Sequence, residues 1–550
     1  MTDLSKWHLA NIWEGIADAL PDSEAVIFED RRITWREYND MASRLAQAFV
    51  EHGLKPGAKV SLYSYNSVEY LVAQFAAFKA RLCPINVNYR YLETELAHVI
   101  NNSDSEAIVF QAGFAPRLDA IRDQLSDVKL FVCVDDGSDD ELAGAFNYDE
   151  LIAKTSPMPA IDRSEGDIYM LYTGGTTGLP KGVMYDHLTF SKSLVSKAME
   201  LRGLPLPDTP ADIVPIAKKL AAAGASPKCI PGCPLMHGTG MWVGVVIPHS
   251  LGGCVTLFDN RSFDPDALLA LIERESAQEI VIVGDVFAKP MVSAMERMKG
   301  AGKTRDFSSL RMVNSSGVMF SAESKRALLE HMDVTIFDSM GSTEGSIGVS
   351  IATRESISGD KTARFKLSPT SKVMTEDGRE ITPGSNEVGL LCNGGMVPIG
   401  YYKDDEKSQE TFRVFNGVRY SVPGDYAQLE ADGTITLLGR GSTCINSGGE
   451  KIFPEEVEEA IKSHASVYDC LVVGVPDERF GECVTAVFST VTDTAVSPDQ
   501  LKQHVRGLLA DYKAPRHYVE TEQVPRADNG KADYKTTKSI ALKFLGMESG

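Results

Sequence analysis

The sequence predicts an α/β fold divided into at least two domains. Two patterns lead to this prediction. Apolar strand-like runs alternate with amphipathic helical runs over residues 1–160, and short strands with turns dominate from residue 387 onward. A chain of 550 residues is also too long for one ordinary hydrophobic core. We therefore expect a large N-terminal α/β domain followed by a smaller C-terminal domain.

Composition and charge restrict the class of protein. The residues are 43% hydrophobic, which is enough to bury more than one core, and no run reaches 18 consecutive apolar residues. The N-terminus is polar and acidic rather than a basic segment followed by an apolar one, so a cytoplasmic protein without an integral membrane segment is expected. A net charge of −21 argues against binding to nucleic acid or to an anionic membrane surface.

The nine cysteines are scattered along the chain, and their odd number does not suggest a disulfide framework. They are expected to be small buried residues of a protein in a reducing compartment. Cys229 and Cys233 are close enough to suggest a metal-binding pair. Because no Cys or His pair of suitable spacing accompanies them, a structural role is expected for both.

Hydrophobic periodicity predicts the elements of the first 160 residues. Helices are expected where apolar residues recur every three to four positions, and strands where short apolar runs are bounded by turn residues. The expected helices are 11–20, 34–52, 69–79 and 91–101. The expected strands are 25–28, 59–64, 81–86, 107–110 and 130–134.

Residues 172–183 form the most distinctive stretch of the chain. They read YTGGTTGLPKGV and follow the strand-like run 167–171. Glycines let the backbone bring N–H groups close to an anion, threonine hydroxyls add donors, and lysine adds positive charge. The stretch therefore predicts a phosphate-binding loop rather than a flexible Gly/Thr turn, although it is neither a P-loop nor a dinucleotide fingerprint. Its candidate residues are Thr173, Gly174, Gly175, Thr176, Thr177, Gly178 and Lys181.

Residues 203–317 are predicted to continue the α/β pattern after a long irregular segment. The stretch 203–234 is rich in Pro and Ala, carries a helical piece at 216–223, and is expected to be an excursion that shapes a nearby site. Ser316 and Gly317 end a predicted strand, which is where open α/β sheets place ligands. Buried strands are expected at 251–258, 279–283 and 310–315, with a helix at 266–275.

The C-terminal part is predicted to contain a β-rich subdomain and a compact α+β unit. We expect a hinge at about 440–442, which divides the chain into a domain of residues 1–440 and a domain of residues 441–550. The β-rich subdomain covers about residues 350–440. The expected strands are 388–392, 420–425, 427–430, 434–438, 469–475 and 482–490, and the expected helices are 454–463 and 497–509.

Five motifs occur in an order and spacing that resemble those of the adenylate-forming superfamily, which includes acyl-CoA synthetases, peptide-synthetase adenylation domains and beetle luciferases. After the phosphate-binding loop come DSMGSTEG at 338–345, YSVPGD at 420–425, GR at 439–440 and PRADNGK at 525–531. The likeness spans nearly the whole chain. Three further stretches, 86–91, 418–428 and 445–458, are most similar to acyl-CoA synthetases that activate steroid side-chain or long-chain carboxylic acids.

The resemblance implies both an architecture and a reaction. The large domain would contain two layered sheets and a small β-barrel subdomain, and the small α+β domain would be a mobile lid. A carboxylate would attack the α-phosphate of ATP, and the acyl group of the resulting acyl-AMP would pass to CoA. Glu344 matches the carboxylate that binds Mg²⁺, and Thr343 matches a donor to phosphate. A Thr-Glu pair often caps a helix, and that role does not exclude the catalytic one.

The resemblance also assigns residues to the nucleotide. Asp425 matches the acid that accepts both ribose hydroxyls, although alone it would be a turn residue, and Arg440 matches the arginine that contacts ribose and phosphate. Asp338 matches the residue that contacts the adenine amino group, and Ser316 with Gly317 matches the segment along adenine. The motif that contains Asp338 adds Ser339, Met340, Gly341 and Ser342 as nucleotide-binding candidates.

Two residues are candidates for work on the acyl group. Lys531 matches the lid lysine that bridges carboxylate and phosphate oxygens during adenylation, although most lysines near a C-terminus are solvated. His237 matches a gate beside the acyl carbonyl. No triad partner for His237 is visible, so positioning rather than general-base work is expected, and a purely structural role is the alternative.

One further match lies in the predicted lid, and two residues of the chain depart from the family pattern. Ser447, Gly448 and Gly449 match the turn that lines the pantetheine path once the lid rotates. Met340 stands where the family usually has tyrosine, and it would still offer a soft apolar surface to adenine. Ser442 stands where the hinge usually has aspartate or lysine.

The sequence therefore predicts an ATP- and Mg²⁺-dependent acid:CoA ligase for a bulky hydrophobic acid. One alternative is an acyl-AMP ligase that loads a carrier protein, and another is a non-catalytic acyl-nucleotide-binding protein. Partners are expected to be the acid, ATP and CoA, with a homodimer as one expectation for the assembly. The acyl pocket is expected along residues 237–244, 283–291 and 314–320.

Overall fold

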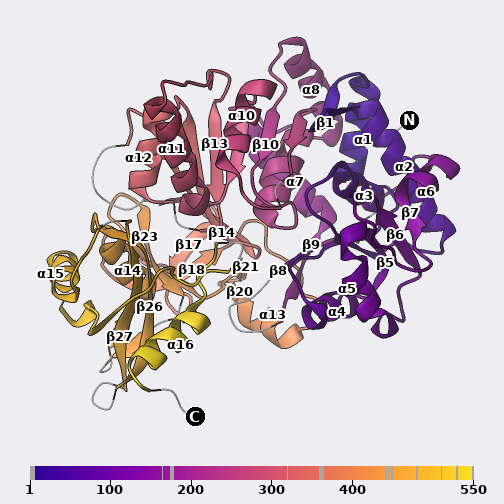
Figure 1. The fold of residues 1–550 in the computed structure, drawn as a ribbon. Coiled ribbons are helices and arrows are strands. Elements are labelled where there is room, and N and C mark those ends of the chain that lie inside the picture. The colour runs from indigo at the N-terminus through magenta and orange to yellow at the C-terminus, as the bar shows by residue number, and fades with distance from the viewer. Residues whose placement is uncertain are drawn as a thin grey trace. The chain divides into compact units, whose positions relative to one another are not determined.

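The computed structural model describes residues 6–163, 165–173, 179–259, 261–318, 320–357, 365–440, 443, 445–447, 450–477, 481–492, 494–509, 511–527 and 530–547. The chain divides into two units. Unit 1 consists of Met1–Gly345, Ile351–Gly359 and Met396–Gln409. Unit 2 consists of Ser346–Ser350, Asp360–Gly395 and Glu410–Gly550. Figure 1 labels their helices and strands.

The first sheet of unit 1 has five parallel strands in the order β4-β3-β5-β6-β7. The strands are β3 (Lys59–Tyr63), β4 (Cys83–Asn86), β5 (Ser105–Gln111), β6 (Leu130–Val134) and β7 (Phe146–Asn147). The helices between and around them are α2 (Trp35–Glu51), α3 (Val68–Lys79), α4 (Glu93–Asn102), α5 (Ala115–Ala120) and α6 (Tyr148–Lys154), with short 3₁₀ turns at Ala112–Phe114 and Arg122–Gln124. The strand expected from residue 81 begins only at Cys83, because Arg81 takes a left-handed φ of 60°.

Local side chains explain where these helices begin and end. Thr34 accepts a hydrogen bond from the Glu37 N–H, and the Glu37 carboxylate accepts one from the Thr34 N–H, so the two residues form a capping box at the start of α2. Ser67 caps α3 in the same way through the Tyr70 N–H. Gly53 follows α2 with a φ of 86°, a conformation that glycine adopts without strain.

The second sheet of unit 1 has the strand order β2-β1-β11-β10-β12-β13-β14 and is parallel except for β2. Its strands are β1 (Glu24–Phe28), β2 (Arg31–Thr34), β10 (Lys228–Pro231), β11 (Cys254–Leu257), β12 (Glu279–Ile282), β13 (Met312–Ser316) and β14 (Thr335–Ser342). The remaining helices of this part are α1 (Leu9–Ala19), α7 (His187–Glu200), α8 (Ile213–Ala222), the π-helix η4 (Thr239–Val246), α9 (Ile247–His249), α10 (Pro265–Glu275), α11 (Gly284–Gly300) and α12 (Ala322–His331), with a 3₁₀ turn at Pro210–Asp212.

One sequence prediction for this region is wrong. Residues 203–234 were expected to form an irregular excursion around a single helix, yet they contain strand β10 in the middle of the sheet, between β11 and β12. The strand has only four residues and ends in a proline, so it carries almost no periodic signal. Pairing with strands on both sides stabilises it.

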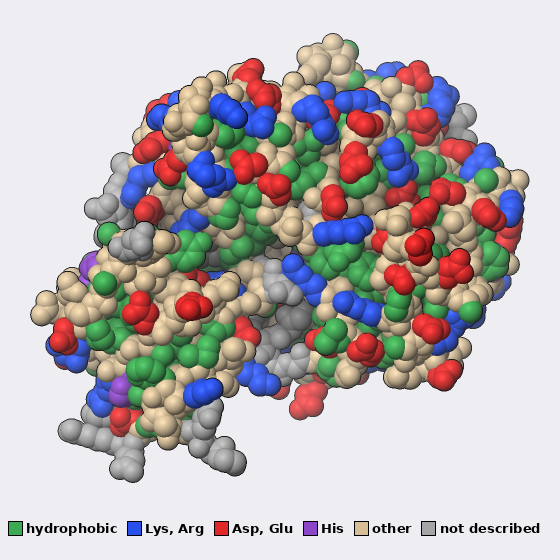
Figure 2. All heavy atoms as spheres, viewed as in Figure 1, with side chains coloured by type: hydrophobic (Ala, Val, Ile, Leu, Met, Phe, Trp, Pro, Cys, Tyr) green, Lys and Arg blue, Asp and Glu red, His purple; other side chains and the backbone are tan. Residues whose placement is uncertain are grey.

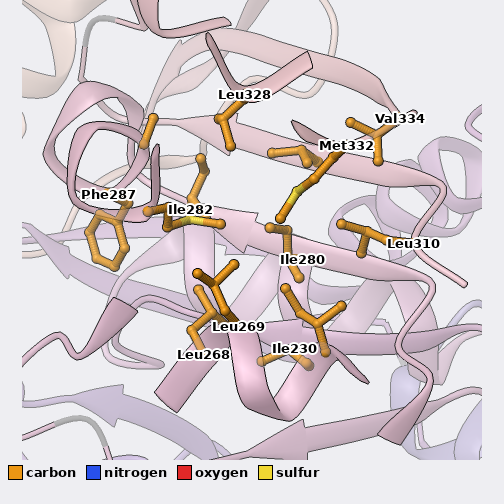
Figure 3. Close-up of a cluster of buried hydrophobic side chains, with 14 of the residues drawn as sticks. Ile230, Leu268, Leu269, Ile280, Ile282, Phe287, Leu310, Leu328, Met332 and Val334 are labelled. Carbon is orange, nitrogen blue, oxygen red and sulfur yellow. The ribbon is translucent and has the colours of Figure 1, made fainter. Parts of the chain in front are cut away.

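One hydrophobic core of unit 1 lies where α10, α11 and α12 pack on strands β12 to β14. Figure 3 shows the side chains of Ile280, Ile282, Leu268, Phe287 and Leu328 in one cluster from these elements. Burying each such side chain stabilises the fold by about 1.5–3 kcal/mol. This packing holds the carboxyl ends of β13 and β14, which carry several predicted site residues.

A three-stranded antiparallel sheet, β19-β9-β8, carries the predicted phosphate-binding loop. Strands β8 (Ile168–Thr173) and β9 (Lys181–Asp186) pair from Ile168↔Asp186 to Thr173↔Lys181, and β19 (Gly400–Tyr401) adds the third strand. Gly182 is required here, because a Cβ atom would lie 2.6 Å from Met170 Sδ. The loop therefore connects two strands rather than a strand and a helix.

Buried polar side chains anchor the end of this hairpin that lies away from the loop. Asp167, directly before β8, pairs with Arg81 at 2.8 Å and lies 3.5 Å from His8 Nε2. The His8 ring stacks on the ring of His187, the first residue of α7, with centroids 3.9 Å apart. Burial lowers the pKa of both imidazoles, so both rings are neutral near pH 7.

Unit 2 begins with antiparallel strands in the order β15-β16-β23-β22-β18-β21-β20, with β17 beside β18. These are β15 (Gly345–Ala352), β16 (Phe365–Leu367), β17 (Ser371–Met374), β18 (Val388–Asn393), β20 (Phe412–Phe415), β21 (Val418–Ser421), β22 (Asp425–Leu429) and β23 (Thr434–Arg440), with α13 (Asp405–Thr411) before β20. The expected strand 420–425 is in fact the end of β21 and the start of β22, separated by a turn at Pro423 and Gly424. Gly424 takes a φ of 97°, which explains the break.

The rest of unit 2 is an α+β arrangement with the strand order β25-β24-β27-β26 and with β28 parallel to β27. The strands are β24 (Ile445–Ser447), β25 (Glu450–Ile452), β26 (Val467–Asp477), β27 (Gly481–Thr490) and β28 (His517–Glu520). The helices are α14 (Pro454–Lys462), α15 (Pro498–Leu508) and α16 (Tyr534–Phe544), with a 3₁₀ turn at Asp511–Lys513. The expected helices and the two long strands are present within two residues of the predicted bounds, whereas β28 and α16 were not anticipated.

Surface charge and hydropathy add two observations. On the face shown in Figure 2, Lys and Arg side chains are scattered among Asp and Glu rather than gathered into one basic surface. Among the residues that the structure describes, no helix combines the length and apolar character needed to cross a membrane.

Candidate active site

The three segments predicted to line an acyl pocket meet around Gly317, just beyond the end of β13. A Cβ atom on Gly317 would lie 3.6 Å from Val283 Cγ1 and 3.8 Å from Thr239 Oγ1. Gly317 has a φ of 100°, so it makes the tight turn expected from the sequence. The hydroxyl of Ser315, near the end of β13, accepts a hydrogen bond from the Gly284 N–H at 3.0 Å, which joins the strand to the start of α11.

The π-helix η4 forms one wall of this region, a feature that the sequence did not predict. Gly240 and Gly244 let the helix approach the preceding segment. A Cβ on Gly240 would lie 2.3 Å from the Pro234 carbonyl oxygen, and one on Gly244 would lie 2.7 Å from Pro231 Cβ. π-Helical turns are rare and occur frequently at functional sites.

His237 lies two residues before the first residue of this helix and is half-buried. Its carbonyl oxygen accepts a hydrogen bond from the Met241 N–H at 3.0 Å, and its own N–H donates to the Pro234 carbonyl at 3.2 Å. These two backbone hydrogen bonds fix the position of the backbone from which the imidazole side chain extends. Its predicted role as a gate stays a prediction.

Asp338 is the fourth of the eight residues of β14 and is buried in an ion pair. Lys325 of α12 donates from Nζ to Asp338 Oδ2 at 2.6 Å, and both side chains are almost fully buried. Burial raises the pKa of the Asp338 carboxyl, and the adjacent Lys325 ammonium opposes that shift. Of the residues that follow, Ser339, Met340 and Ser342 are half-buried and Gly341 is exposed.

Thr343 and Glu344 occupy the turn between β14 and β15, so neither residue begins a helix. Glu344 is 9% exposed, and its Oε1 accepts a hydrogen bond from the Tyr401 hydroxyl at 2.8 Å. The Thr343 carbonyl oxygen accepts a hydrogen bond from the Tyr185 hydroxyl. Burial, reinforced by the Glu344 carboxylate, raises the pKa of Tyr185, so its hydroxyl stays a donor. Two tyrosines from the hairpin sheet thus hold this turn.

Lys181 joins the exit of the phosphate-binding loop to the same group of residues. Its Nζ donates to Asp404 Oδ2 at 2.6 Å and lies 5.8 Å from the centre of the Tyr401 ring. The hydrogen bond from Lys181 lowers the pKa of the Asp404 carboxyl. Lys181, Tyr401 and Glu344 therefore form one contiguous chain of contacts, with Thr173 opposite Lys181 across the hairpin.

In unit 2, the strand register brings together two residues predicted to contact ribose. Asp425, the first residue of β22, is the direct partner of Arg440, the last residue of β23, in the antiparallel pair. Ser447 ends β24 and pairs with Gly481 of β27. Both observations concern backbone positions.

Lys531 is exposed and follows a tight turn in unit 2. The Gly530 N–H donates to the Ala527 carbonyl at 2.7 Å, and the Ala527 N–H donates to the Lys531 carbonyl at 2.8 Å. Arg526 forms two hydrogen bonds with Asp469 of β26 and a third, at 3.1 Å, with the Gly530 carbonyl. The turn that carries Lys531 is thereby fixed to the sheet of its own unit.

Comparison with known proteins decides the family. The chain matches the model of the AMP-binding enzyme family over residues 13–402 and the model of the AMP-binding enzyme C-terminal domain over residues 456–531. The chain belongs to the AMP-binding enzyme family. Together with the curated CoA ligases and the solved structures described next, these matches confirm the prediction of an adenylate-forming acyl-CoA synthetase and its predicted fold class.

Two curated relatives of this AMP-binding enzyme align over nearly the full length. The medium/long-chain-fatty-acid–CoA/3-oxocholest-4-en-26-oate–CoA ligase of Mycolicibacterium smegmatis is 38% identical over 97% of this chain and 96% of its own. The 3-oxocholest-4-en-26-oate–CoA ligase of Rhodococcus rhodochrous is 39% identical over 96% of this chain and 95% of its own.

Among solved structures, the anthranilate CoA ligase AuaEII with anthranoyl-AMP has a TM-score of 0.83 at 20% identity, covering 98% of both chains. The ATP-bound MatB of Rhodopseudomonas palustris has a TM-score of 0.80 at 23% identity over 98% and 100%. Both likenesses support the fold.

Sequence reasoning about this AMP-binding enzyme did not single out Asn86 as a site residue. Its Nδ2 donates to the carbonyls of Tyr172 and Met236 at 2.8 and 2.7 Å, and its Oδ1 accepts from the Tyr172 N–H at 2.7 Å. One amide at the end of β4 therefore connects the start of the phosphate-binding loop to the segment before His237. A polar residue that ends a buried strand is the signal that marks it.

Several predicted site residues of this AMP-binding enzyme lie outside the described residues. They are Gly174, Gly175, Thr176, Thr177, Gly178, the hinge residue Ser442, Gly448 and Gly449. Among the described candidates, Gly317, Asp338, Glu344 and Lys181 belong to unit 1, and the others named above for strands β22 to β24 and for the turn before Lys531 belong to unit 2.

Proposed function

We propose that this enzyme is an ATP- and Mg²⁺-dependent acid:CoA ligase for a bulky hydrophobic acid of steroid side-chain or fatty-acid type. The acid would be activated as acyl-AMP and transferred to CoA, with release of pyrophosphate and AMP. The observation that carries this proposal is near-full-length identity of 37–39% to ligases named for such acids. The proposed cellular location is the cytoplasm, and a homodimer stays a prediction.

We assign roles in adenylation from the geometry of unit 1. Glu344 would hold Mg²⁺, which binds proteins through one or two carboxylates and otherwise through water and substrate phosphates. The bound ion would offset charge repulsion between carboxylate and triphosphate. Lys181 would leave Asp404 to contact the β- and γ-phosphates, and Thr343 would donate to phosphate. His237 would position the acyl carbonyl.

We assign the remaining roles to unit 2. Asp425 and Arg440 would bind the ribose, and Lys531 would bridge the carboxylate and phosphate oxygens during adenylation. We place the lid at residues 441–550 with its hinge at 440–442, and we expect the lid to rotate between the two half-reactions, with Ser447, Gly448 and Gly449 along the pantetheine path.

A panel of carboxylic acids tests the substrate class. CoA consumption is expected to be fastest with steroid side-chain acids or long-chain fatty acids, because the segments around Gly317 present aliphatic and small side chains such as Val283. Initial rates are measured with ATP and CoA saturating. Much faster turnover of short or aromatic acids would reject the proposed class while leaving the reaction type intact.

The same preparation separates the rival functions. A carrier-loading ligase would exchange pyrophosphate into ATP in the presence of acid but would not consume free CoA. A non-catalytic nucleotide-binding protein would show neither activity. The proposed ligase does both.

Replacing Tyr401 with phenylalanine is expected to raise the Mg²⁺ concentration for half-maximal adenylation by about tenfold, because partners that orient a metal-binding carboxylate typically contribute that much. Saturating Mg²⁺ should restore most of the rate. The neighbouring Tyr402→Phe is the matched control, since the Tyr402 hydroxyl donates to Asp104 and not to Glu344. Identical Mg²⁺ curves for both variants would show that the Tyr401 hydroxyl does not orient Glu344.

A further inference from the structure

The buried ion pair between Lys325 and Asp338 has no role in the functions assigned so far. The two side chains are 3% and 4% exposed, and Lys325 Nζ lies 2.6 Å from Asp338 Oδ2. Removing two charges from water is costly, and close hydrogen-bonded geometry only partly offsets that cost. A buried pair of this kind is therefore weak evidence for a contribution to stability.

The position of the pair relates it to the nucleotide site. Strand β14 alternates, so Ile336 and Asp338 are both buried on the face that packs against α12, whose Leu328 belongs to the same core as Ile336. Asp338 is the last buried residue before the strand end, where open α/β sheets bind ligands. Lys325 approaches it from α12 and also lies 5.2 Å from the centre of the Phe320 ring.

The charged groups around Asp338 come from helices α12 and α11. Lys325 of α12 contacts Oδ2, and among the described residues no other side chain donates to this carboxylate. Asp285 at the start of α11 is the nearby like charge. It accepts hydrogen bonds from the Ser321 N–H and hydroxyl and lies 4.0 Å from Lys289. Burial and Asp285 raise the pKa of Asp338, whereas Lys325 lowers it.

We infer that Lys325 is a positioning residue that sets the base specificity of the nucleotide site. The Lys325 ammonium keeps Asp338 ionised and, by its hydrogen bond to Oδ2, orients the carboxylate. The other carboxylate oxygen then accepts a hydrogen bond from an exocyclic amino group and repels an exocyclic carbonyl. This inference rests on the proposed function, an ATP-dependent ligase, and on the sequence-based prediction that Asp338 contacts the adenine amino group.

The two protonation states of Asp338 predict different nucleotide preferences. An ionised carboxylate can only accept hydrogen bonds, so it favours the 6-amino group of ATP over the 6-carbonyl group of inosine triphosphate. Without Lys325, no positive charge of the pair would offset the effect of burial on the Asp338 carboxyl, so Asp338 would bind a proton at a higher pH. A protonated carboxyl can donate to the inosine carbonyl, so the discrimination would fall.

Dissociation constants for ATP and inosine triphosphate, measured by calorimetry on the full-length protein, test this inference. Lys325→Met is expected to lower the preference for ATP by about tenfold, because charge-assisted hydrogen bonds are roughly twice as strong as neutral ones. The preference should recover as the pH rises and Asp338 ionises, and Lys325→Arg should retain it at neutral pH. A purely structural role would weaken binding of both nucleotides equally.

The wild-type protein and a second variant distinguish failure of the proposed function from failure of the role inferred for Lys325. If the wild type binds neither nucleotide, the proposed function fails. If it prefers ATP and Lys325→Met keeps the same preference at every pH, only the role of Lys325 is rejected. Should Lys325→Met fail to fold, Asp338→Asn carries the test. Its preference must be lower than that of the wild type and independent of pH, and an unchanged preference overturns the inference.

Discussion

Lys531→Ala is expected to slow acyl-adenylate formation by about 10²–10³-fold while the thioester still forms from supplied acyl-AMP, since the lost contact exists only while the acyl–phosphate bond is made. Lys531 would place its ammonium between a carboxylate and a phosphate oxygen, and alanine leaves both anions without that contact. Ground-state binding of ATP should change little, because the proposed function assigns the triphosphate to residues of unit 1.

The local structure supports a well-defined position for this lysine. Arg526 pairs with Asp469 through two hydrogen bonds and also holds the Gly530 carbonyl, so the turn before Lys531 is fixed from within unit 2. Gly530 has a φ of 78°, which an alanine would adopt only with strain. Lys531→Ala leaves these contacts in place and should not lower the melting temperature.

Two separate assays distinguish the half-reactions. ATP–pyrophosphate exchange in the presence of acid reports adenylation, and acyl-CoA formation from synthetic acyl-AMP reports the second step. Lys535→Ala, an exposed lysine at the start of α16 in the same unit, is the matched control and should behave as wild type in both. Equal loss of both activities in Lys531→Ala would reject the assignment of this residue to adenylation alone.

Where a local signal exists, the sequence predicts the fold well. The capping box of Thr34 and Glu37 and the glycine after α2 mark that helix within one residue. The order of the motifs leads to the family, because phosphate, metal and ribose each require particular residue types. Strand β10 shows the limit, since four residues that end in Pro231 become a central strand only through their neighbours.

The contacts that organise the candidate site escape prediction for a physical reason. Tyr401 is 57 residues from Glu344, and Asp404 is 223 residues from Lys181, so neither contact leaves a periodic trace. The ion pair of Lys325 is equally hard to predict from the sequence, because a lysine on an amphipathic helix is expected to face water. Only the fold brings these partners together. Hydrogen bonds between segments that are distant in the sequence determine which side chain contacts each motif residue.

Glu344→Gln is expected to lower the rate of adenylation by about 100-fold or more, because an amide keeps the shape of the side chain but removes the charge that we propose holds Mg²⁺. The glutamine carbonyl can still accept the hydrogen bond from Tyr401, so the turn between β14 and β15 should stay in place. The expected loss therefore comes from the metal site and not from a rearranged backbone.

The measurement is ATP–pyrophosphate exchange as a function of Mg²⁺ concentration, together with thermal melting. Glu344→Gln should show a low rate that rising Mg²⁺ only partly restores, with a melting temperature close to that of the wild type, and Glu344→Asp should lie between the two. Glu355→Gln, an exposed carboxylate of the same unit, is the matched control and should leave the Mg²⁺ curve unchanged. Because Tyr401→Phe weakens only the orientation of Glu344, its curve must fall between those of wild type and Glu344→Gln. A Glu344→Gln enzyme with the wild-type Mg²⁺ dependence would mean that another group holds the metal.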